Sequence, residues 1–354
     1  MNAIRTTPPR PLDVTAIFPR LAPMARPAMR LHPRPGVPSV HESSAGGPLL
    51  WPADEPWPHC DKTHQGGEEA LARLRLEQRI RANKAMHPDG DHPVPQHTPE
   101  EQAVLDRLNS EETWLDDSWL DAPVALLPVA QLYMRDIPIL RPPVQTGADL
   151  LQVLWCPLEH FPEQHMPKTV AVIWRSAAAV TDILVTPPEA PVVTKGYVPE
   201  PCVLAPEQIT EYPNLMELSK ELQNQIRDGS IWQTKIAAVD SSYAPYPESF
   251  YHDHLSVAPG WKVGGWPQWG YTDPVPRDCS TCGTPMEPLL SVDSREWDSS
   301  TISWIPDEEQ ADASLNPCDP DLANPTTIQI ADNHKLQIYF CPAAPEHPHM
   351  ELMQ

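Results

Sequence analysis

The sequence predicts a β-rich α+β fold made of two tandem copies of a related, mainly antiparallel sheet unit, joined by an amphipathic helix. Two observations support this prediction. The segment Leu151-Gln-Val-Leu-Trp-Cys-Pro157 returns as Leu336-Gln-Ile-Tyr-Phe-Cys-Pro342, which is an internal repeat. In addition, the 354 residues include 47 prolines but only 14 glycines, and this proline density favours short strands, edges and extended loops over long helices.

A second motif precedes the first in each copy. Gly46-Gly-Pro-Leu-Leu-Trp51 is similar to Gly264-Gly-Trp-Pro-Gln-Trp269, and a cysteine follows each, Cys60 in the first copy and Cys279 in the second. Because the two motifs recur in the same order, we expect each copy to be one folding unit.

The first half of the chain divides into an arm and a repeat. Residues 1–40 are rich in Pro and Arg, which is typical of a flexible or polyproline arm. The first repeat is expected over residues 41–200, with a helical insertion at about residues 61–122, where Thr98-Pro-Glu-Glu101 is a capping box. Runs rich in Val, Ile, Leu and aromatics predict strands over residues 126–134, 148–156 and 168–175.

A connector and the second repeat make up the remainder. Residues 201–245 are predicted to be helical, since apolar residues recur at helical intervals from Pro213 to Asp228, and this helix is expected to pack across the joint between the repeats. The second repeat is expected over residues 246–354, with a turn at Asp332-Asn-His334. Its predicted strands cover residues 288–293, 326–331 and 335–340.

Charge and composition restrict the functional class. The net charge is −23, and because residues 1–40 have a balance of +5, the rest of the chain holds −28. A body this acidic disfavours nucleic-acid binding, which depends on Lys and Arg at phosphates. The acidity is compatible with a basic protein or peptide partner, and equally with a well-hydrated surface.

Cellular location follows from apolar runs and cysteine usage. No run approaches the length of a membrane span, and the N-terminus lacks a signal-peptide core, so no membrane association is expected. Seven cysteines, an odd number spread along the chain, fit reduced thiols better than a disulfide framework. We therefore expect a cytoplasmic protein.

The Gly-Gly-Trp corners are the candidate binding residues. Adjacent glycines permit positive φ or a close backbone approach, and the following Pro and Trp make a stiff aromatic corner. One interpretation is a groove for an extended or proline-rich peptide, and the other is that each Trp fills its own small core. The candidates are Trp51, Trp57, Gly264, Gly265, Trp266 and Trp269.

A Cys-x-x-Cys pair in the second copy is the candidate metal site. Cys279 and Cys282 have zinc-knuckle spacing, and Cys341 is a candidate third ligand. A fourth ligand would have to be Cys318 or a histidine such as His254. The first copy keeps Cys60 and Cys156 but has no second knuckle cysteine, so the sequence predicts a zinc site once at most, and buried, inert thiols are the alternative.

The sequence lacks the common enzyme motifs. The sequence has no P-loop, dinucleotide-binding glycine fingerprint, G-x-S-x-G elbow or kinase motif set, so no enzymatic activity and no required cofactor are expected.

Together the motifs resemble a family. Gly-Gly-x-Pro-x-Trp, then Cys279-x-x-Cys-Gly-x-Pro-Met286, then Leu336-Gln-Ile-Tyr-Phe-Cys341 resemble the YwqG-like family of bacterial proteins, which is distantly similar to the programmed cell death protein 2 group. The resemblance covers residues 254–342 well and residues 41–175 more weakly. It implies a duplicated β-rich unit without established enzyme activity, and roles as a ribosomal-protein chaperone or in toxin neutralisation.

Three hypotheses follow. The first is a non-enzymatic protein- or peptide-binding module, chaperone-like or toxin-neutralising, with a cleft between two β-rich repeats and a basic client. The second is a zinc-dependent hydrolase or zinc-stabilised domain built on the cysteines of the second copy. The third is a purely structural or host-specific interaction protein.

Overall fold

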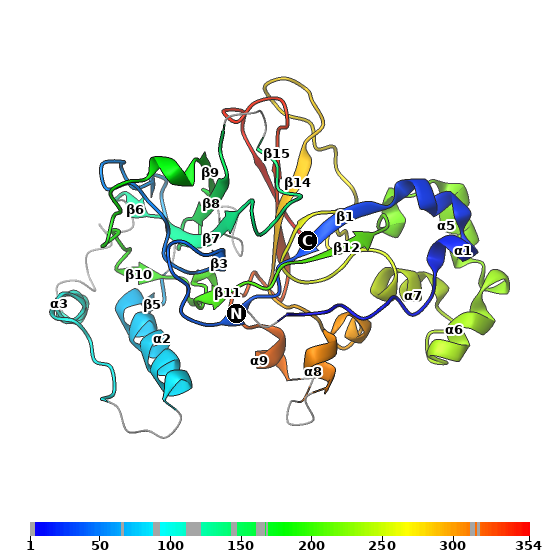
Figure 1. Cartoon of the computed structure of the whole chain (residues 1–354), viewed down its shortest axis with the longest axis horizontal. Helices are drawn as coiled ribbons and strands as arrows, with labels where there is room; N and C mark the ends of the chain where they lie inside the picture. The colour runs from blue at the N-terminus through cyan, green and yellow to red at the C-terminus, as the bar shows by residue number, and fades with distance from the viewer. Residues whose placement is uncertain are drawn as a thin grey trace.

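The computed structural model describes residues 4–64, 67–87, 93–110, 122–142, 147–160, 167, 169–311, 316 and 319–354. Within these ranges two large antiparallel sheets occupy the centre of the molecule, and helices lie at its periphery (Figure 1). The predicted mixed α+β fold with mainly antiparallel sheets is therefore confirmed.

The first sheet belongs to the first repeat and the second sheet to the second. The first sheet has the spatial order β2 (Arg34–Pro35), β11 (Cys202–Val203), β3 (Ser44–Ala45), β7 (Leu127–Tyr133), β8 (Leu150–Trp155) and β9 (Ala171–Arg175). The second sheet has the order β12 (Glu207–Glu211), β1 (Arg26–Arg30), β13 (Lys262–Gly264), β14 (Glu287–Asp293), β15 (Lys335–Phe340) and β16 (Met350–Met353). Two small sheets pair β4 (His59–Cys60) with β6 (Val124–Ala125), and β5 (Glu69–Ala70) with β10 (Val192–Val193).

The helices lie in three places. An insertion in the first repeat contributes α2 and α3, the connector region contributes α5, α6 and α7 beside α1, and the second repeat contributes α8 and α9 (Figure 1). Their bounds are α1 Val14–Ile17, α2 Leu71–Met86, α3 Pro99–Leu108, α5 Lys220–Arg227, α6 Gln233–Val239, α7 Pro247–His254, α8 Asp307–Ala311 and α9 Pro320–Ala323. No helix of the described ranges is both long and apolar enough to cross a membrane.

The duplicated sequence segments occupy equivalent strands. The repeated Leu-Gln segment is β8 in one sheet and β15 in the other, each paired with the strand that precedes it in its repeat. Those preceding strands share an irregularity, because the register shifts after Pro128 in β7 and after Pro288 in β14. The order β3-β7-β8-β9 thus corresponds to β13-β14-β15-β16.

A two-stranded ribbon links the two sheets. Residues 26–30 pair antiparallel with residues 207–211, and residues 34–35 pair in the same register with residues 202–203, so that Arg26 is opposite Glu211 and Pro35 is opposite Cys202. At one end β1 adds to β13 of the second sheet, and at the other end β11 adds to β3 of the first sheet. Each repeat therefore completes its sheet with a strand that stands before the other repeat in the chain, and we call this element the crossover ribbon.

The crossover ribbon corrects the expectation of a flexible arm at residues 1–40, of which residues 1–3 lie outside the described ranges. The Pro and Arg content of residues 1–40 suggested disorder, yet β1 is an interior strand between β12 and β13. The proline is accommodated because β13 pairs only with residues 28–30, so Pro27 needs to donate no hydrogen bond there. Arg30 is fully buried, and its charge is met by internal acceptors.

The connector helix is also placed differently from the prediction. A 3₁₀ turn at Leu215–Glu217 precedes α5, and α5 packs with α1, α6 and α7 at the outer end of the second sheet instead of across the joint (Figure 1). The joint is filled by the strands of the crossover ribbon, whose apolar side chains share one core with both sheets.

The structure confirms most of the other local predictions. The capping box at Thr98 is present at the start of α3, and strands lie within or near five of the six predicted runs. The predicted strand over residues 326–331 is wrong, since that segment has only an isolated bridge from Ile330 to His334. The segment is mostly irregular and leads into a turn at residues 331–333, directly before β15.

The Gly-Gly corner of the second repeat encloses a buried ion pair. Lys262 Nζ lies 2.6 and 2.7 Å from the carboxylate oxygens of Glu211, and both side chains are fully buried. The same carboxylate accepts hydrogen bonds from the backbone N–H groups of Ala258 and Trp266. Gly265 has φ +75°, and a Cβ there would collide with Glu211.

We expect Gly265→Ala to lower the free energy of unfolding by about 2–4 kcal/mol, because alanine disfavours positive φ and its Cβ would disturb the buried ion pair. Urea titration measures this. Gly270→Ala is the matched control, since a Cβ there meets no atom within 4 Å, and its effect should stay within about 0.5 kcal/mol. Equal effects of the two substitutions would contradict the role assigned to Gly265.

Candidate metal centres

Each repeat brings four metal-binding side chains together. The first cluster consists of Cys60, His64, Cys156 and His160, and in it the four candidate ligand atoms all lie within 4.8 Å of one another. The second cluster meets the same criterion, with the residues Cys279, Cys282, Cys341 and His347.

The duplicated strand explains why both clusters exist. Cys156 directly follows β8 and Cys341 directly follows β15, so the repeated segment carries one cysteine of each cluster to the same end of its sheet. In the first repeat Cys60 ends β4, which pairs with β6. Each cluster thus ties the end of a central strand to a segment that comes earlier in its repeat.

The knuckle of the second cluster is a tight turn. The N–H of Cys279 donates to Thr284 O at 2.9 Å, and the N–H of Gly283 donates to Cys279 O at 2.8 Å. Gly283 has φ +70°, a conformation that glycine adopts without strain. This turn directs the side chains of Cys279 and Cys282 toward Cys341.

The distances between donor atoms fit tetrahedral zinc. With Zn–S near 2.3 Å and Zn–N near 2.0 Å, donor atoms of a tetrahedron lie about 3.3–3.8 Å apart. In the second cluster the sulfur atoms of Cys282 and Cys341 are 3.6 Å apart, and His347 Nδ1 lies 3.3 Å from Cys341 and 3.7 Å from Cys279. In the first cluster Cys60 Sγ lies 3.2 Å from His160 Nε2.

The first cluster is enclosed, and all four of its residues are buried. Hydrogen bonding to Cys156 and then to His160 lowers the pKa of the Cys60 thiol, while the same contact with Cys60 and burial raise the pKa of Cys156. Thr169 Oγ1 lies 3.1 Å from Cys60 Sγ. The pair therefore favours one thiolate, which is the form that binds metal.

The second cluster is open to solvent on one side. Cys279 and Cys341 are buried, but Cys282 is exposed and His347 is half-buried. Hydrogen bonds from the hydroxyl and N–H groups of Thr284 lower the pKa of Cys282 to about 6. Burial raises the pKa of Cys341. Cys282 is thus the most reactive described thiol of the cluster.

The sequence identified three members of the second cluster but not the fourth. His347 stands beside Cys279 and Cys341, whereas His254 lies on α7 with its ring against Tyr243 and Phe250. Cys318, the other candidate, lies outside the described residues. His347 precedes a proline in a short His-Pro-His segment, and the sequence offered only its spacing from Cys341 as a signal.

The structure has two candidate clusters in its described residues, whereas the sequence predicted one zinc site at most. The first copy replaces the second knuckle cysteine with His64, and His160 occupies the place that His347 has in the second copy. Cys60-x₃-His64 and Cys156-x₃-His160 share the same spacing, and that pattern is visible in the sequence once histidine is admitted as a ligand.

The tryptophans of the first copy fill the core. The rings of Trp51 and Trp57 are buried 4.9 Å apart, and their N–H groups donate to the carbonyls of Glu55 and Leu126. Arg175 covers the ring of Trp51. Trp57 borders a groove between α2 and the first sheet, of about 390 Å³.

The tryptophans of the second copy are likewise buried. Trp266 donates to Met24 O and Trp269 donates to a carboxylate oxygen of Glu217. Arg26 stacks on the ring of Trp266, with its guanidinium carbon 3.5 Å from the ring centre. Among the described residues the four indoles therefore do not line one common groove. Gly265 allows the close approach of Glu211, and Gly264, at φ +69°, lies against Ile139 and Pro27 O.

Comparison with known proteins gives no family assignment. No family model matches the chain, and no curated protein matches it significantly. The resemblance to the YwqG-like family stays a prediction from the motifs.

The chemistry of the two donor sets is that of soft, nitrogen- and sulfur-rich sites. Two thiolates with two imidazoles, or three thiolates with one imidazole, suit Zn²⁺ in tetrahedral coordination. Four protein donors would complete the tetrahedral coordination of such an ion.

We expect Cys282 to react with iodoacetamide at least about tenfold faster than Cys202 in chelator-treated protein, because it is exposed and its thiolate is favoured. Cys202 is the internal control, since it is buried and burial raises its pKa. Mass spectrometry of the labelled peptides gives both rates. Adding zinc should protect Cys282, and equal labelling with and without zinc would contradict its assignment as a ligand.

Proposed function

We propose that the chain is a non-enzymatic protein-binding module whose two repeats are each stabilised by a structural zinc ion. The observation that carries the proposal is the presence of a complete four-donor cluster at the equivalent position of both repeats. Duplication of a strand alone explains one shared cysteine, but the two clusters differ in ligand identity and spacing while both retain four donors.

Closed donor sets favour a structural over a catalytic role. Catalytic zinc sites keep an open position beside three protein ligands, whereas structural sites have four. The zinc-dependent hydrolase is therefore the weaker alternative.

Zinc at these positions would act as a clamp. Each cluster joins the end of β8 or β15 to a segment that is distant in sequence, so bound metal would cross-link the chain in the folded state and not in the unfolded state. Reduced thiols are required for this, and the described cysteines are free, which supports the proposal of a cytoplasmic location.

A binding role is supported by the surface. The net charge of −23 favours encounter with basic partners. A polar hollow of about 420 Å³ lies between the repeats, lined by Glu159 and Tyr197 on one side and by Tyr271 and His334 on the other. Partner binding by such a module needs no catalytic group.

We expect protein purified without added metal to contain about two zinc ions per chain, and Cys60→Ser or Cys341→Ser to contain about one. Each substitution should lower the melting temperature by about 10 °C or more, because metal binding contributes directly to folding. Elemental analysis and thermal unfolding measure the two effects.

Cys202→Ser is the matched control, as a buried cysteine outside both clusters, and it should keep both zinc ions. A wild-type protein with substoichiometric zinc, together with an unchanged melting temperature for Cys60→Ser and Cys341→Ser, would exclude the structural zinc ions.

A further inference from the structure

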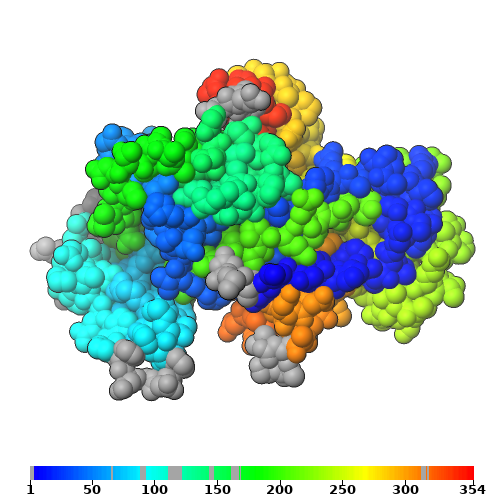
Figure 2. Space-filling view, in the orientation of Figure 1, coloured from blue at the N-terminus to red at the C-terminus, as the bar shows by residue number. Residues whose placement is uncertain are grey.

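The N-terminal strap, residues 4–13, lies along the surface of the molecule. In Figure 2 this dark blue segment runs across the face above the orange region that includes α8. None of its residues is buried. Its backbone accepts a hydrogen bond from the body, in which Asp307 N donates to Thr6 O. The strap therefore resembles a bound peptide more than a core element.

Carboxylates of α8 hold the beginning of the strap. Arg5 Nε donates to Glu309 Oε1 at 2.6 Å. The N–H and hydroxyl groups of Thr6 donate to the two carboxylate oxygens of Glu308, at 2.8 and 2.9 Å. These contacts are made by side chains of the body, so they recognise an arginine and a neighbouring hydroxyl residue on an extended backbone.

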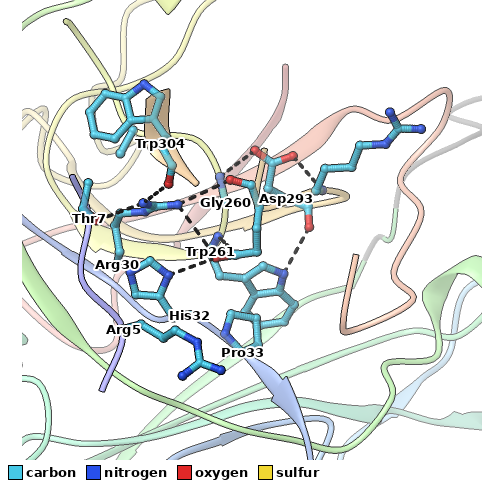
Figure 3. A network of polar contacts seen from close by, with 12 residues as sticks. Arg5, Thr7, Arg30, His32, Pro33, Gly260, Trp261, Asp293 and Trp304 are labelled. Atoms are coloured by element: carbon cyan, nitrogen blue, oxygen red, sulfur yellow. Dashed lines mark hydrogen bonds and ion pairs between the residues drawn. The ribbon is translucent and has the colours of Figure 1, made fainter. Parts of the chain in front are cut away.

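Thr7 connects the strap to the buried polar network of the crossover ribbon (Figure 3). Its N–H and hydroxyl groups donate to Glu207, and its hydroxyl oxygen accepts from Arg30 Nη1 at 2.9 Å. Arg30 also donates to Trp304 O. The network thus offers an anchoring point for one small hydroxyl side chain.

An aromatic face receives the second arginine of the strap. The guanidinium carbon of Arg10 lies 3.4 Å from the ring centre of Trp304, and Arg10 Nη2 donates to Ser303 O at 2.9 Å. Between the two arginines, Pro8 and Pro9 stiffen the backbone and lower the entropy lost on binding. Stacked arginine and stiff proline are features of extended-peptide recognition.

Two hollows adjoin the strap along its length. A hollow of about 560 Å³ adjoins Arg5 and Thr6, and another of about 340 Å³ adjoins the segment from Thr7 to Val14. Glu207 lines both hollows and Trp304 lines the second, so the surface that holds the strap extends into open space, and we call this surface the strap groove.

We propose that this groove is the docking site for an extended Arg/Pro-containing segment of a partner protein, and that the strap occupies the site as an internal competitor. The proposal rests on the proposed function as a protein-binding module and names the chemistry of its partner. The contacts specify an arginine beside Glu309, whose Oε1 also accepts from Arg34 of the crossover ribbon. They further specify a hydroxyl residue for Glu308 and Glu207, and an arginine for Trp304. The charge of the remaining body, −28 without residues 1–40, attracts such a segment.

The test uses a fluorescent synthetic peptide with the sequence of residues 2–14 and the full-length chain. A tethered strap competes at an effective concentration in the mM range, so wild-type protein should bind the free peptide weakly. The variant Arg5→Ala/Arg10→Ala weakens the strap in its own groove and should bind the peptide about tenfold or more tightly than wild type. Fluorescence anisotropy measures both affinities.

Matched controls locate the binding site. Arg20→Ala removes an arginine from an exposed ion pair with Glu221 and should leave peptide affinity at the wild-type value. In the strap-weakened background, Glu308→Gln should reduce peptide affinity about fivefold or more, whereas Glu221→Gln should not. A peptide with both arginines replaced by alanine should not bind.

One result overturns the proposal: the strap-weakened variant has a native circular dichroism spectrum, yet it binds the native peptide no more tightly than it binds the alanine-substituted peptide. If the double variant does not fold, Arg5→Ala alone serves as the test, since it keeps the contact with Trp304, and wild-type affinity in that variant overturns the proposal equally. Zinc analysis of the same samples separates the two proposals, because zinc content is independent of peptide binding.

Discussion

The crossover ribbon is the constraint on which the rest of the structure depends. Its two strands keep one register from Arg26–Glu211 to Pro35–Cys202, and each sheet needs one of them to complete its hydrogen bonding. The bend between its halves places His32 at φ +44° and brings its ring near Glu296 and Glu207. Burial disfavours the charge of Glu296, but His32 and Arg30 outweigh burial and hold its pKa below the ordinary value. The interlocked strands and this buried network make the two repeats one unit with a common core.

The candidate sites lie on this frame in different ways. The candidate metal clusters stand at the same end of β8 and β15, within each repeat, so a bound ion would stabilise its own sheet. The strap instead contacts elements of the joint and of the second repeat, through Glu207 and α8. The cluster residues therefore lie within the two repeats, whereas the residues that contact the strap form a charged surface at the joint and on the second repeat. If a partner segment replaced the strap as we propose, neither cluster would have to change.

Local sequence signals predicted much of the fold because they depend on neighbouring residues. The capping box at Thr98 and the β-rich runs of β7, β8, β14 and β15 were found this way. The interior position of β1 was missed because strand pairing across about 180 residues leaves no local pattern, and the Pro-Arg composition of β1 is that of a surface segment. The tryptophans were ambiguous for a related reason, since burial depends on Arg26 and Arg175 covering them. His64, His160 and His347 were missed because the prediction started from the Cys-x-x-Cys pair, and sequence alone does not show which histidine the fold brings to the cysteines.

The first metal cluster also bears on how the chain accommodates its insertion. Cys60 and Cys156 bracket α2 and α3, so these helices lie inside a loop whose ends the cluster holds together. The corresponding loop of the second repeat, from Cys279 to Cys341, is shorter and has no such pair of long helices in its described residues. Since closure entropy grows only logarithmically with length, the longer loop costs only about 0.4 kcal/mol more to close. The two repeats can therefore differ in the length of this loop, because in each of them a bound ion would hold both loop ends.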